Sequence, residues 1–183
     1  MESSLENEIS IDDVRREAAL DVQKKDVARR IQLIIFKLGT EEFALSIDQI
    51  KEVVLTPRIA KMPQTQSYIK GVANIRGSII AILDLEEKFG IDKLGDLSQT
   101  YNYTLVLENE TFKAGFLVRE VPNTLSILST DIENATGFIQ TSTIDDNYIQ
   151  GVVKAGDRLI ILIDIQRLVE GSNINSIVNK VTK

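Results

Sequence analysis

Two aspartates stand at matching places in the sequence and could in principle carry acid chemistry. Asp84 and Asp164 each follow an apolar run, and they lie 80 residues apart. Two carboxylates that share one proton form the catalytic dyad of aspartic proteases, but that chemistry needs each aspartate on a tight glycine turn. Here Leu85-Glu86 and Ile165-Gln166 follow instead, a pattern that predicts the start of a helix. The residues therefore favour two helix N-caps over a catalytic dyad.

The segments after these aspartates support the same interpretation. Glu87 stands three residues after Asp84 and predicts a capping box. Gly90 and Gly171 follow the two short helical patterns and predict their ends. Both aspartates are thus expected to begin short helices.

The composition removes most other enzyme chemistry. The chain has no Cys and no His, which excludes disulfides, thiolate sites, histidine metal sites and a Ser-His-Asp triad. No glycine-rich phosphate loop occurs, and Asp145-Asp146-Asn147 lacks the spacing of a calcium loop. Nothing in the sequence combines a nucleophile, a base and an oxyanion donor. We expect a protein that is not an enzyme and needs no cofactor or metal.

Length and charge narrow the remaining classes. The 183 residues suffice for one domain or two small ones, with 43% hydrophobic and 26% charged residues. A net charge of −6, an aromatic content of 5% and the absence of Trp disfavour a nucleic-acid binder. No run reaches the length of a membrane helix, and the acidic, polar start is unlike a secretory signal. The cytoplasm is the expected compartment.

The chain divides into a charged extension and a β-rich part. Residues 1–30 carry six basic and eight acidic side chains, and about 11–30 is expected to be a charged helix outside the core. From Ile31 onward, short apolar β-branched runs alternate with turns and predict hairpins, as in 31–47, 72–83, 104–118 and 151–163. Spacing of i, i+3, i+4, i+7 in the tail predicts an amphipathic helix at about 172–183.

An internal repeat organises this β-rich part. Tyr68-Ile69-Lys70-Gly71-Val72 recurs 80 residues later as Tyr148-Ile149-Gln150-Gly151-Val152, and the match continues through both aspartates. The front of each half is weaker, with Phe43 and Phe112 as candidate counterparts. We expect two copies of one small β unit that pack on each other and leave a groove between them. The predicted fold class is mainly β, with a first barrel at about 31–95 and a second at about 101–170.

The role that remains is binding of another protein, and two charged residues are candidates for it. Arg76 stands in a strand-turn between apolar neighbours, and Glu52 is a suitable ion-pair partner. Ordinary surface charge explains both residues equally well.

The ordered set of motifs resembles CheW-type chemotaxis coupling proteins from about residue 31 to 170. The first half contributes Phe36-Lys-Leu-Gly-x-Glu-Glu-Phe43-Ala, Ile50-x-Glu52-Val53, Tyr68-Ile-Lys-Gly71-Val, Asn74-Ile-Arg76-Gly77 and Ile82-Leu-Asp84-Leu. The second half contributes Gly115-Phe-Leu-Val118, Tyr148-Ile-x-Gly151-Val and Gly156-Asp157-Arg158-Leu-Ile-Ile-Leu-Ile-Asp164-Ile. The resemblance implies two five-stranded SH3-like barrels packed around a shared core, in agreement with the repeat.

The resemblance also implies a function and its surfaces. Such proteins are cytoplasmic adaptors at membrane-associated chemoreceptor arrays, and they bridge the receptor signalling tip to the CheW-like regulatory domain of the chemotaxis histidine kinase. The receptor groove would comprise Ile34, Ile47, Ile50, Glu52, Val53, Arg76 and Val121. The kinase-binding face would lie on the first barrel around Ile59, Met62 and Gly71. Ile34 and Ile47 could also be ordinary core residues, because most buried aliphatic side chains have only a structural role.

Some positions depart from the family pattern. Ala81 stands where many relatives carry Pro, and Arg119 stands where an acidic residue is common, which predicts reversed charge near the partner surface of the second barrel. The N-terminal extension is longer than typical. These departures leave open a specialised paralogue that binds only the kinase or serves a non-flagellar pathway.

Overall fold

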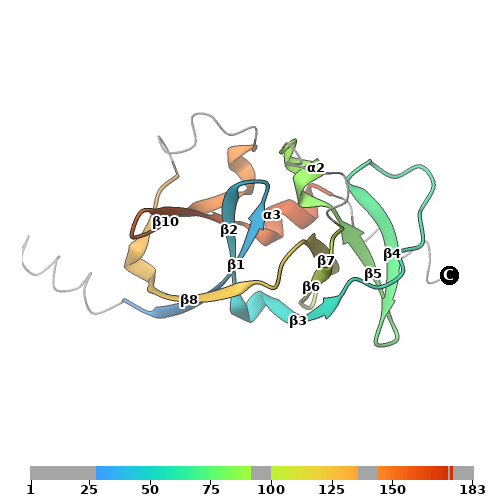
Figure 1. Ribbon diagram of the computed structural model, residues 1–183, viewed down its shortest axis with the longest axis horizontal. Helices are drawn as coiled ribbons and strands as arrows, with labels where there is room; N and C mark the ends of the chain where they lie inside the picture. Colours follow the sequence, from blue (N-terminus) through green and yellow to red (C-terminus); the bar gives the residue numbers. More distant parts are fainter. Residues whose placement is uncertain (1–27, 92–99, 136–143, 173, 175–183) are drawn as a thin grey trace, which may run out of the picture.

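In the part of the chain that the structure describes, two β-sheets pack with the short helices α2 (Leu85–Phe89) and α3 (Ile165–Glu170) between them (Figure 1). The computed structural model describes residues 28–91, 100–135, 144–172 and 174. The predicted N-terminal helix lies outside this part of the chain, except that Arg30 already begins a strand. Of the predicted C-terminal helix, Ser172 lies in a turn and Ile174 is helical, and both are buried; the rest lies outside the described residues.

The six-stranded sheet has the order β8-β1-β2-β11-β10-β9. Its strands are β1 (Arg30–Leu38), β2 (Glu41–Ser46), β8 (Asn123–Leu128), β9 (Ile132–Glu133), β10 (Ile149–Ala155) and β11 (Arg158–Ile163). All neighbours are antiparallel except β2 and β11, which pair in parallel through Ile160–Glu42, Ile161–Phe43 and Leu162–Ala44.

The five-stranded sheet has the order β3-β6-β7-β5-β4. Its strands are β3 (Ile50–Leu55), β4 (Ile69–Ile75), β5 (Ser78–Leu83), β6 (Tyr103–Glu108) and β7 (Lys113–Val118). Here β5 and β7 form the parallel pair. The counterpart of the short β9 is a single bridge between Ala60 and Val72, so one sheet has six strands and the other five.

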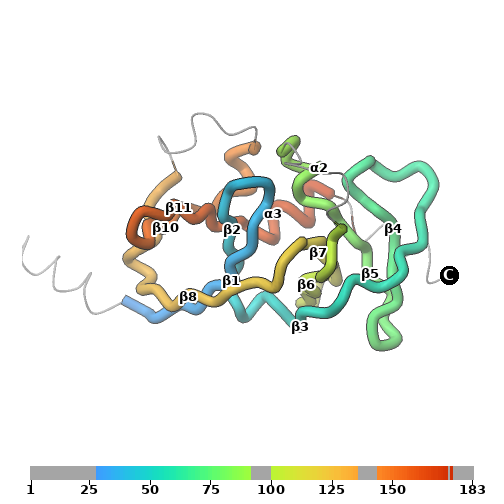
Figure 2. Tube along the Cα trace, viewed as in Figure 1, coloured from blue at the N-terminus to red at the C-terminus, as the bar shows by residue number. Residues whose placement is uncertain are grey.

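The two sheets exchange hairpins between the two halves of the sequence. Strands β1 and β2 lie beside β8 and β11, whereas β6 and β7 lie between β3 and β5. In Figure 2 the blue β1–β2 hairpin accordingly joins the orange and red end of the chain. The expected division into consecutive barrels at 31–95 and 101–170 is therefore wrong, because each half donates its first hairpin to the barrel of the other.

The repeat itself is confirmed at the level of the elements. In both halves the register shifts at the same place, between Ile69 and Gly71 and between Ile149 and Gly151. The parallel pairings place Phe43 opposite Ile161 and Ala114 opposite Ala81, which is the repeat position of Ile161. The expected match of Phe43 with Phe112 is thus wrong, since Phe112 precedes β7.

Strands at the centre of each sheet bury both of their faces. Along β1, Leu33 and Ile35 point into a cluster made only by the six-stranded sheet, whereas Ile34 and Phe36 join a core shared by both sheets and both helices. In β5, Ile80 and Ile82 belong to the interior of the five-stranded sheet, and Ala81 and Leu83 belong to the shared core. Continuous apolar runs in the sequence arise from this burial on two sides. The fold is mainly β, with two SH3-like barrels around a common core.

Edge strands β3 and β8 were not predicted as strands. Their burial alternates along much of each strand, from half-buried to exposed in β3, because one face of an edge strand meets solvent. Three short 3-10 turns, η1 (Ile47–Gln49), η2 (Ser129–Asp131) and η3 (Asp146–Tyr148), each lead into the next strand.

Both predicted N-caps are confirmed. Asp84 accepts a hydrogen bond from the Glu87 amide at 3.1 Å at the start of α2 (Leu85–Phe89), and Asp164 accepts one from the Arg167 amide at 3.2 Å at the start of α3 (Ile165–Glu170). The amide of Asp84 donates to the Tyr68 carbonyl at 2.8 Å, in place of the predicted capping box.

The two glycines that end these helices do so for different reasons. Gly90 takes the predicted left-handed conformation with φ 65°. Gly171 keeps helical angles, and a Cβ there would meet the Tyr148 hydroxyl at 2.9 Å. Glycine at position 171 is therefore favoured by the close approach of Tyr148 and not by its backbone conformation.

Candidate functional surfaces

The β4–β5 turn presents Arg76 at one end of the five-stranded sheet. Arg76 and Gly77 both have positive φ, at 50° and 85°, and Asn74 accepts a hydrogen bond from the Gly77 amide at 2.9 Å. Two central residues with positive φ define the tight turn that suits a two-residue hairpin, for which Asn and Gly are the usual choices. Arginine is an unusual residue in this conformation.

Glu52 on β3 is the partner of Arg76, as the sequence suggested. Arg76 Nε lies 2.7 Å from Glu52 Oε2, and the side chains are 78% and 18% exposed. Arg76 directly follows β4, and β3 and β4 are the two outer strands in the hydrogen-bonded order of the sheet, so this ion pair connects the two edges of the sheet. An exposed pair of this kind contributes about 0–1 kcal/mol to stability.

Three predicted groove residues belong to the shared core. Ile34 is 7% exposed, which agrees with the purely structural interpretation. Ile47 and Ile50 are half-buried and pack against the same cluster from η1 and the start of β3. All three side chains therefore belong to or pack against the shared core.

The remaining apolar groove residues are exposed. Val53 on β3 is 39% exposed and Val121, after β7, is 61% exposed. Leu55, which sequence analysis missed, is 72% exposed and stands two residues from Val53 on the same face of β3. The β-branched, apolar run Val53-Val54-Leu55 could have indicated a strand here, but not which of its faces is exposed.

The three predicted kinase-face residues gather at β4. Residues 59–62 run beside β4, where Ala60 and Val72 exchange hydrogen bonds of 2.8 and 2.9 Å. Met62 packs against Ile69 and Val72. Gly71 has φ 139°, and a Cβ there would lie 2.0 Å from the Ala60 carbonyl oxygen, so only glycine permits this approach.

A polar cluster between the sheets was not foreseen. The Glu86 side chain, 1% exposed, accepts hydrogen bonds from Arg119 at 2.6 and 3.1 Å, from the Tyr101 hydroxyl at 2.8 Å and from the Gly39 amide at 3.2 Å. The Arg119 guanidinium also lies over the Tyr101 ring, 4.6 Å from its centroid. The predicted reversal of exposed charge by Arg119 is therefore wrong, because its charge is neutralised inside the molecule.

Electrostatics in this cluster favour the charged forms. Burial by itself would raise the pKa of Glu86, but the hydrogen bonds from Arg119, Gly39 and Tyr101 outweigh it and lower that pKa. The hydrogen bond with Glu86 raises the pKa of Arg119, and burial raises the pKa of Tyr101. The cluster is a fixed ion pair with neutral Tyr101 beside it.

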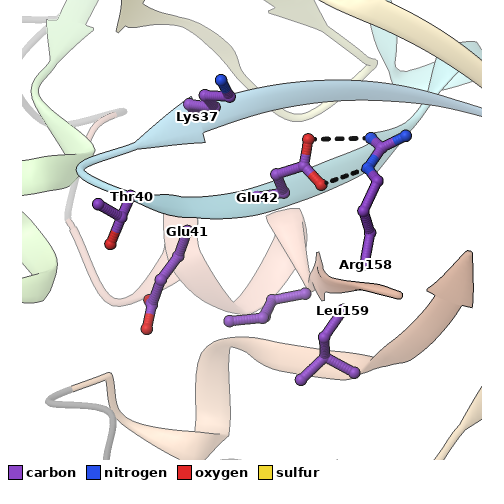
Figure 3. Close-up of a pocket in the computed structure, with 7 residues that line it drawn as sticks. Lys37, Thr40, Glu41, Glu42, Arg158 and Leu159 are labelled. Carbon is purple, nitrogen blue, oxygen red and sulfur yellow. Dashed lines mark hydrogen bonds and ion pairs between the residues drawn. The ribbon is translucent and has the colours of Figure 1, made fainter. Parts of the chain in front are cut away.

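A third arginine–glutamate pair borders a shallow hollow of about 450 Å³ at the junction of β2 and β11. Glu42 and Arg158 face each other there through two hydrogen bonds of 2.7 and 2.9 Å (Figure 3). The hydrogen bond from Arg158 lowers the pKa of Glu42. Since the pair joins the donated hairpin to its host barrel, we assign it to structure.

Within the described ranges the side chains offer surfaces for binding and no metal-ligand cluster. No group of three or more potential ligand side chains comes together there. Nor does any helix of that part have the length and apolarity to cross a membrane. The described residues form a double-barrel β protein with exposed apolar side chains on β3 and after β7.

The chain belongs to the family of CheW-like domains, whose family model matches residues 32–172. It is 30% identical to a chemotaxis protein CheW of Klebsiella aerogenes, over 83% of this chain and 89% of that protein. It is 28% identical to a chemotaxis protein CheW of Helicobacter pylori, over 85% and 92%. The crystal structure of the scaffolding protein TtCheW from Thermoanaerobacter tengcongensis superposes with a TM-score of 0.65 at 32% identity, over 75% of this chain and 86% of that one. Family membership gives the chain a scaffold or adaptor role in chemotaxis signalling.

Proposed function

We propose that this protein is a non-catalytic cytoplasmic adaptor that couples the signalling tip of chemoreceptors to the regulatory domain of a chemotaxis histidine kinase. The receptor tip binds beside β3, and the kinase domain binds the face formed by residues 59–62 and β4. Recruitment to membrane-associated receptor arrays follows from the first contact.

Two features of this part of the molecule support the receptor contact, the exposed apolar residues of β3 and the Arg76–Glu52 ion pair. Val53 and Leu55 form an outward stripe on β3, and Glu52 on the same strand holds Arg76. An amphipathic helix of the receptor tip can lay its apolar face along such a stripe, while the charges set its register.

The conformation of Arg76 is the single observation that carries the receptor contact. A non-glycine residue with positive φ stores backbone strain, on the order of 1–2 kcal/mol. The exposed pair with Glu52 contributes at most about 1 kcal/mol, so it offsets only part of this strain. Asn or Gly would occupy the turn with less strain, so the guanidinium at this place has a use outside the fold.

The kinase face is supported by the way its backbone is held. Gly71 admits residues 59–62 against β4. This approach holds half-buried Met62 against Ile69 and Val72, whereas half-buried Ile59 packs toward the interior of the five-stranded sheet. A kinase regulatory domain of the same family offers a barrel of similar shape. The proposed contact is therefore between two barrels.

Binding of two purified fragments tests the proposal. Receptor-tip and kinase regulatory-domain fragments from the same pathway are titrated against the wild type, Arg76→Glu and Met62→Ala. Arg158→Glu is the matched control, since Arg158 also forms an exposed pair with a glutamate, but on the other barrel.

We expect Arg76→Glu to weaken receptor-tip binding about tenfold, which equals about 1.4 kcal/mol, and to leave kinase binding within about twofold. Met62→Ala should do the reverse, and the control should change neither. A thermal midpoint of Arg76→Glu lowered by more than about 5 °C would show that Arg76 is structural. Wild-type binding to the kinase alone would favour a paralogue without receptor contact, and binding to neither fragment would refute the coupling role.

A further inference from the structure

The Glu86–Arg119 pair is more than a surface contact, because it is enclosed and has several partners. Arg119 is 20% exposed and Glu86 1%, and two hydrogen bonds join them. The Tyr101 hydroxyl lies 2.8 Å from both Glu86 and Asp84, so the cluster extends to the cap of α2. An unpaired buried charge costs several kcal/mol. The two side chains are therefore strongly favoured to stay in contact with each other.

The cluster also joins segments of both barrels. Gly39, in the turn between β1 and β2, donates its amide to Glu86 from the six-stranded sheet. Glu86 belongs to α2, and Arg119 directly follows β7 of the five-stranded sheet. A substitution in this cluster is therefore expected to alter contacts between the two barrels.

The backbone of Arg119 is tied to the end of β3. Asn102 donates its side-chain amide to the Arg119 carbonyl at 3.2 Å, and the Asn102 carbonyl accepts from the Thr56 amide at 2.9 Å. The strand registers place Leu55, Tyr103 and Val118 in one row across the sheet. Arg119 thus lies at the same end of the sheet as exposed Leu55.

Val121 is the exposed residue that this anchor controls. It stands two residues after Arg119 and directly before Pro122, which restricts its backbone to extended conformations. The ion pair holds Arg119 on one side and Pro122 restricts the backbone on the other, so the position of the 61% exposed Val121 depends on both neighbours.

We propose that Arg119 is a positioning residue of the receptor-binding surface, which through its ion pair with Glu86 sets the place of Val121 at the end of the apolar stripe of β3. The receptor tip as the ligand rests on the proposed function. Arg119 itself faces inward and acts through Val121.

A charge-exchange series on the full chain tests this role. The variants are Arg119→Glu, Arg119→Lys, Glu86→Arg and the double variant Glu86→Arg/Arg119→Glu. Each is measured for affinity to the receptor-tip fragment, affinity to the kinase regulatory domain, thermal midpoint and the methyl resonances of Val121. Arg158→Glu again serves as the exposed control.

We expect Arg119→Glu to shift the Val121 resonances, to weaken receptor-tip binding about tenfold and to leave kinase binding within about twofold. The double variant should restore resonances and binding together but in part, because arginine at position 86 can form the ion pair but cannot accept from the Gly39 amide or the Tyr101 hydroxyl. Should Arg119→Glu fail to fold, Arg119→Lys and the double variant decide, with a smaller loss expected for lysine because it lacks the planar two-bond geometry.

Three results would overturn the proposal. The first is normal receptor-tip binding in every variant. The second is equal weakening of both partners, which marks a general structural role. The third is a double variant that regains its midpoint and the Val121 resonances but not receptor binding, which marks direct contact by Arg119.

If the wild type does not bind the receptor tip, the proposed function fails on its receptor side. The positioning role is then decided by the Val121 resonances alone. Resonances that shift in Arg119→Glu and return in the double variant support it, and unchanged resonances overturn it.

Discussion

Helices α2 and α3 occupy the same place in the two repeats, begin in the same way and are held differently. In both, an aspartate caps the first turn, and its amide donates at 2.8 Å to the carbonyl of the repeated tyrosine, Tyr68 or Tyr148. Two residues after the cap, α2 has Glu86, buried against Arg119, whereas α3 has exposed Gln166. A duplicated sequence has kept its local structure, while the surroundings of its helices have diverged.

The bulge glycines of the two repeats show the same divergence. A Cβ on Gly71 would meet only backbone atoms of Ala60 and Lys61, whereas one on Gly151 would meet the Ile132 side chain at 2.7 Å and the Glu133 carbonyl oxygen at 2.8 Å. Only Gly71 has a positive φ. The first repeat is thus the more constrained of the two.

The largest expected difference in stability is between substitutions at the second residue of each helix, Glu86 in α2 and Gln166 in α3. Glu86→Ala should lower the free energy of unfolding by about 3–4 kcal/mol, because it leaves Arg119 enclosed without its carboxylate. Gln166→Ala, the matched change on exposed α3, should cost less than about 0.5 kcal/mol. Urea denaturation measures both, and equal losses would remove the asymmetry on which this comparison rests.

A difference of intermediate size is expected between the bulges. Gly71→Ala should cost about 3 kcal/mol, since a backbone carbonyl must move and the new side chain is held at positive φ. Gly151→Ala should cost about 1–2 kcal/mol, because part of its clash is with a side chain that can rotate. Thermal and urea unfolding of the two variants provide the ranking. The reverse ranking would contradict the placement of residues 59–62 against β4.

The smallest difference concerns the caps. Asp84→Ala should cost about 2 kcal/mol and Asp164→Ala about 1 kcal/mol, since both lose a cap but only Asp84 is fully buried and accepts from Tyr101. Asn at either position keeps an acceptor for the cap and should recover part of the loss. Equal costs at the two positions would mean that the buried hydrogen bond to Tyr101 adds nothing measurable.

Much of the fold could be predicted because its signals are local. The hairpins at 31–47, 72–83, 104–118 and 151–163 follow from apolar runs and turn residues that are close together in the sequence. Caps, turns and the bulge at the repeated glycines are likewise decided within a few residues. Strands β3 and β8 escaped prediction because much of each strand faces solvent and its apolar pattern is weaker.

The candidate binding residues could be predicted from the sequence only in part. The pairing of Arg76 with Glu52 could be suggested, because both stand out among apolar neighbours, and the structure joins them. The burial of Ile34 and the exposure of Leu55 depend on which sheet covers each strand, and the sequence pattern does not reveal it.

The sequence by itself determined that this protein is a duplicated β protein of the CheW-like family with capped helices and no histidine or cysteine chemistry. Only the tertiary structure decided that each half donates its first hairpin to the other barrel, and that Arg119 turns inward to Glu86, 33 positions away. Local features follow from the conformational preferences of neighbouring residues. Hairpin exchange and buried ion pairs depend on contacts between distant segments, whose free energy is set by the burial and complementarity of the assembled core.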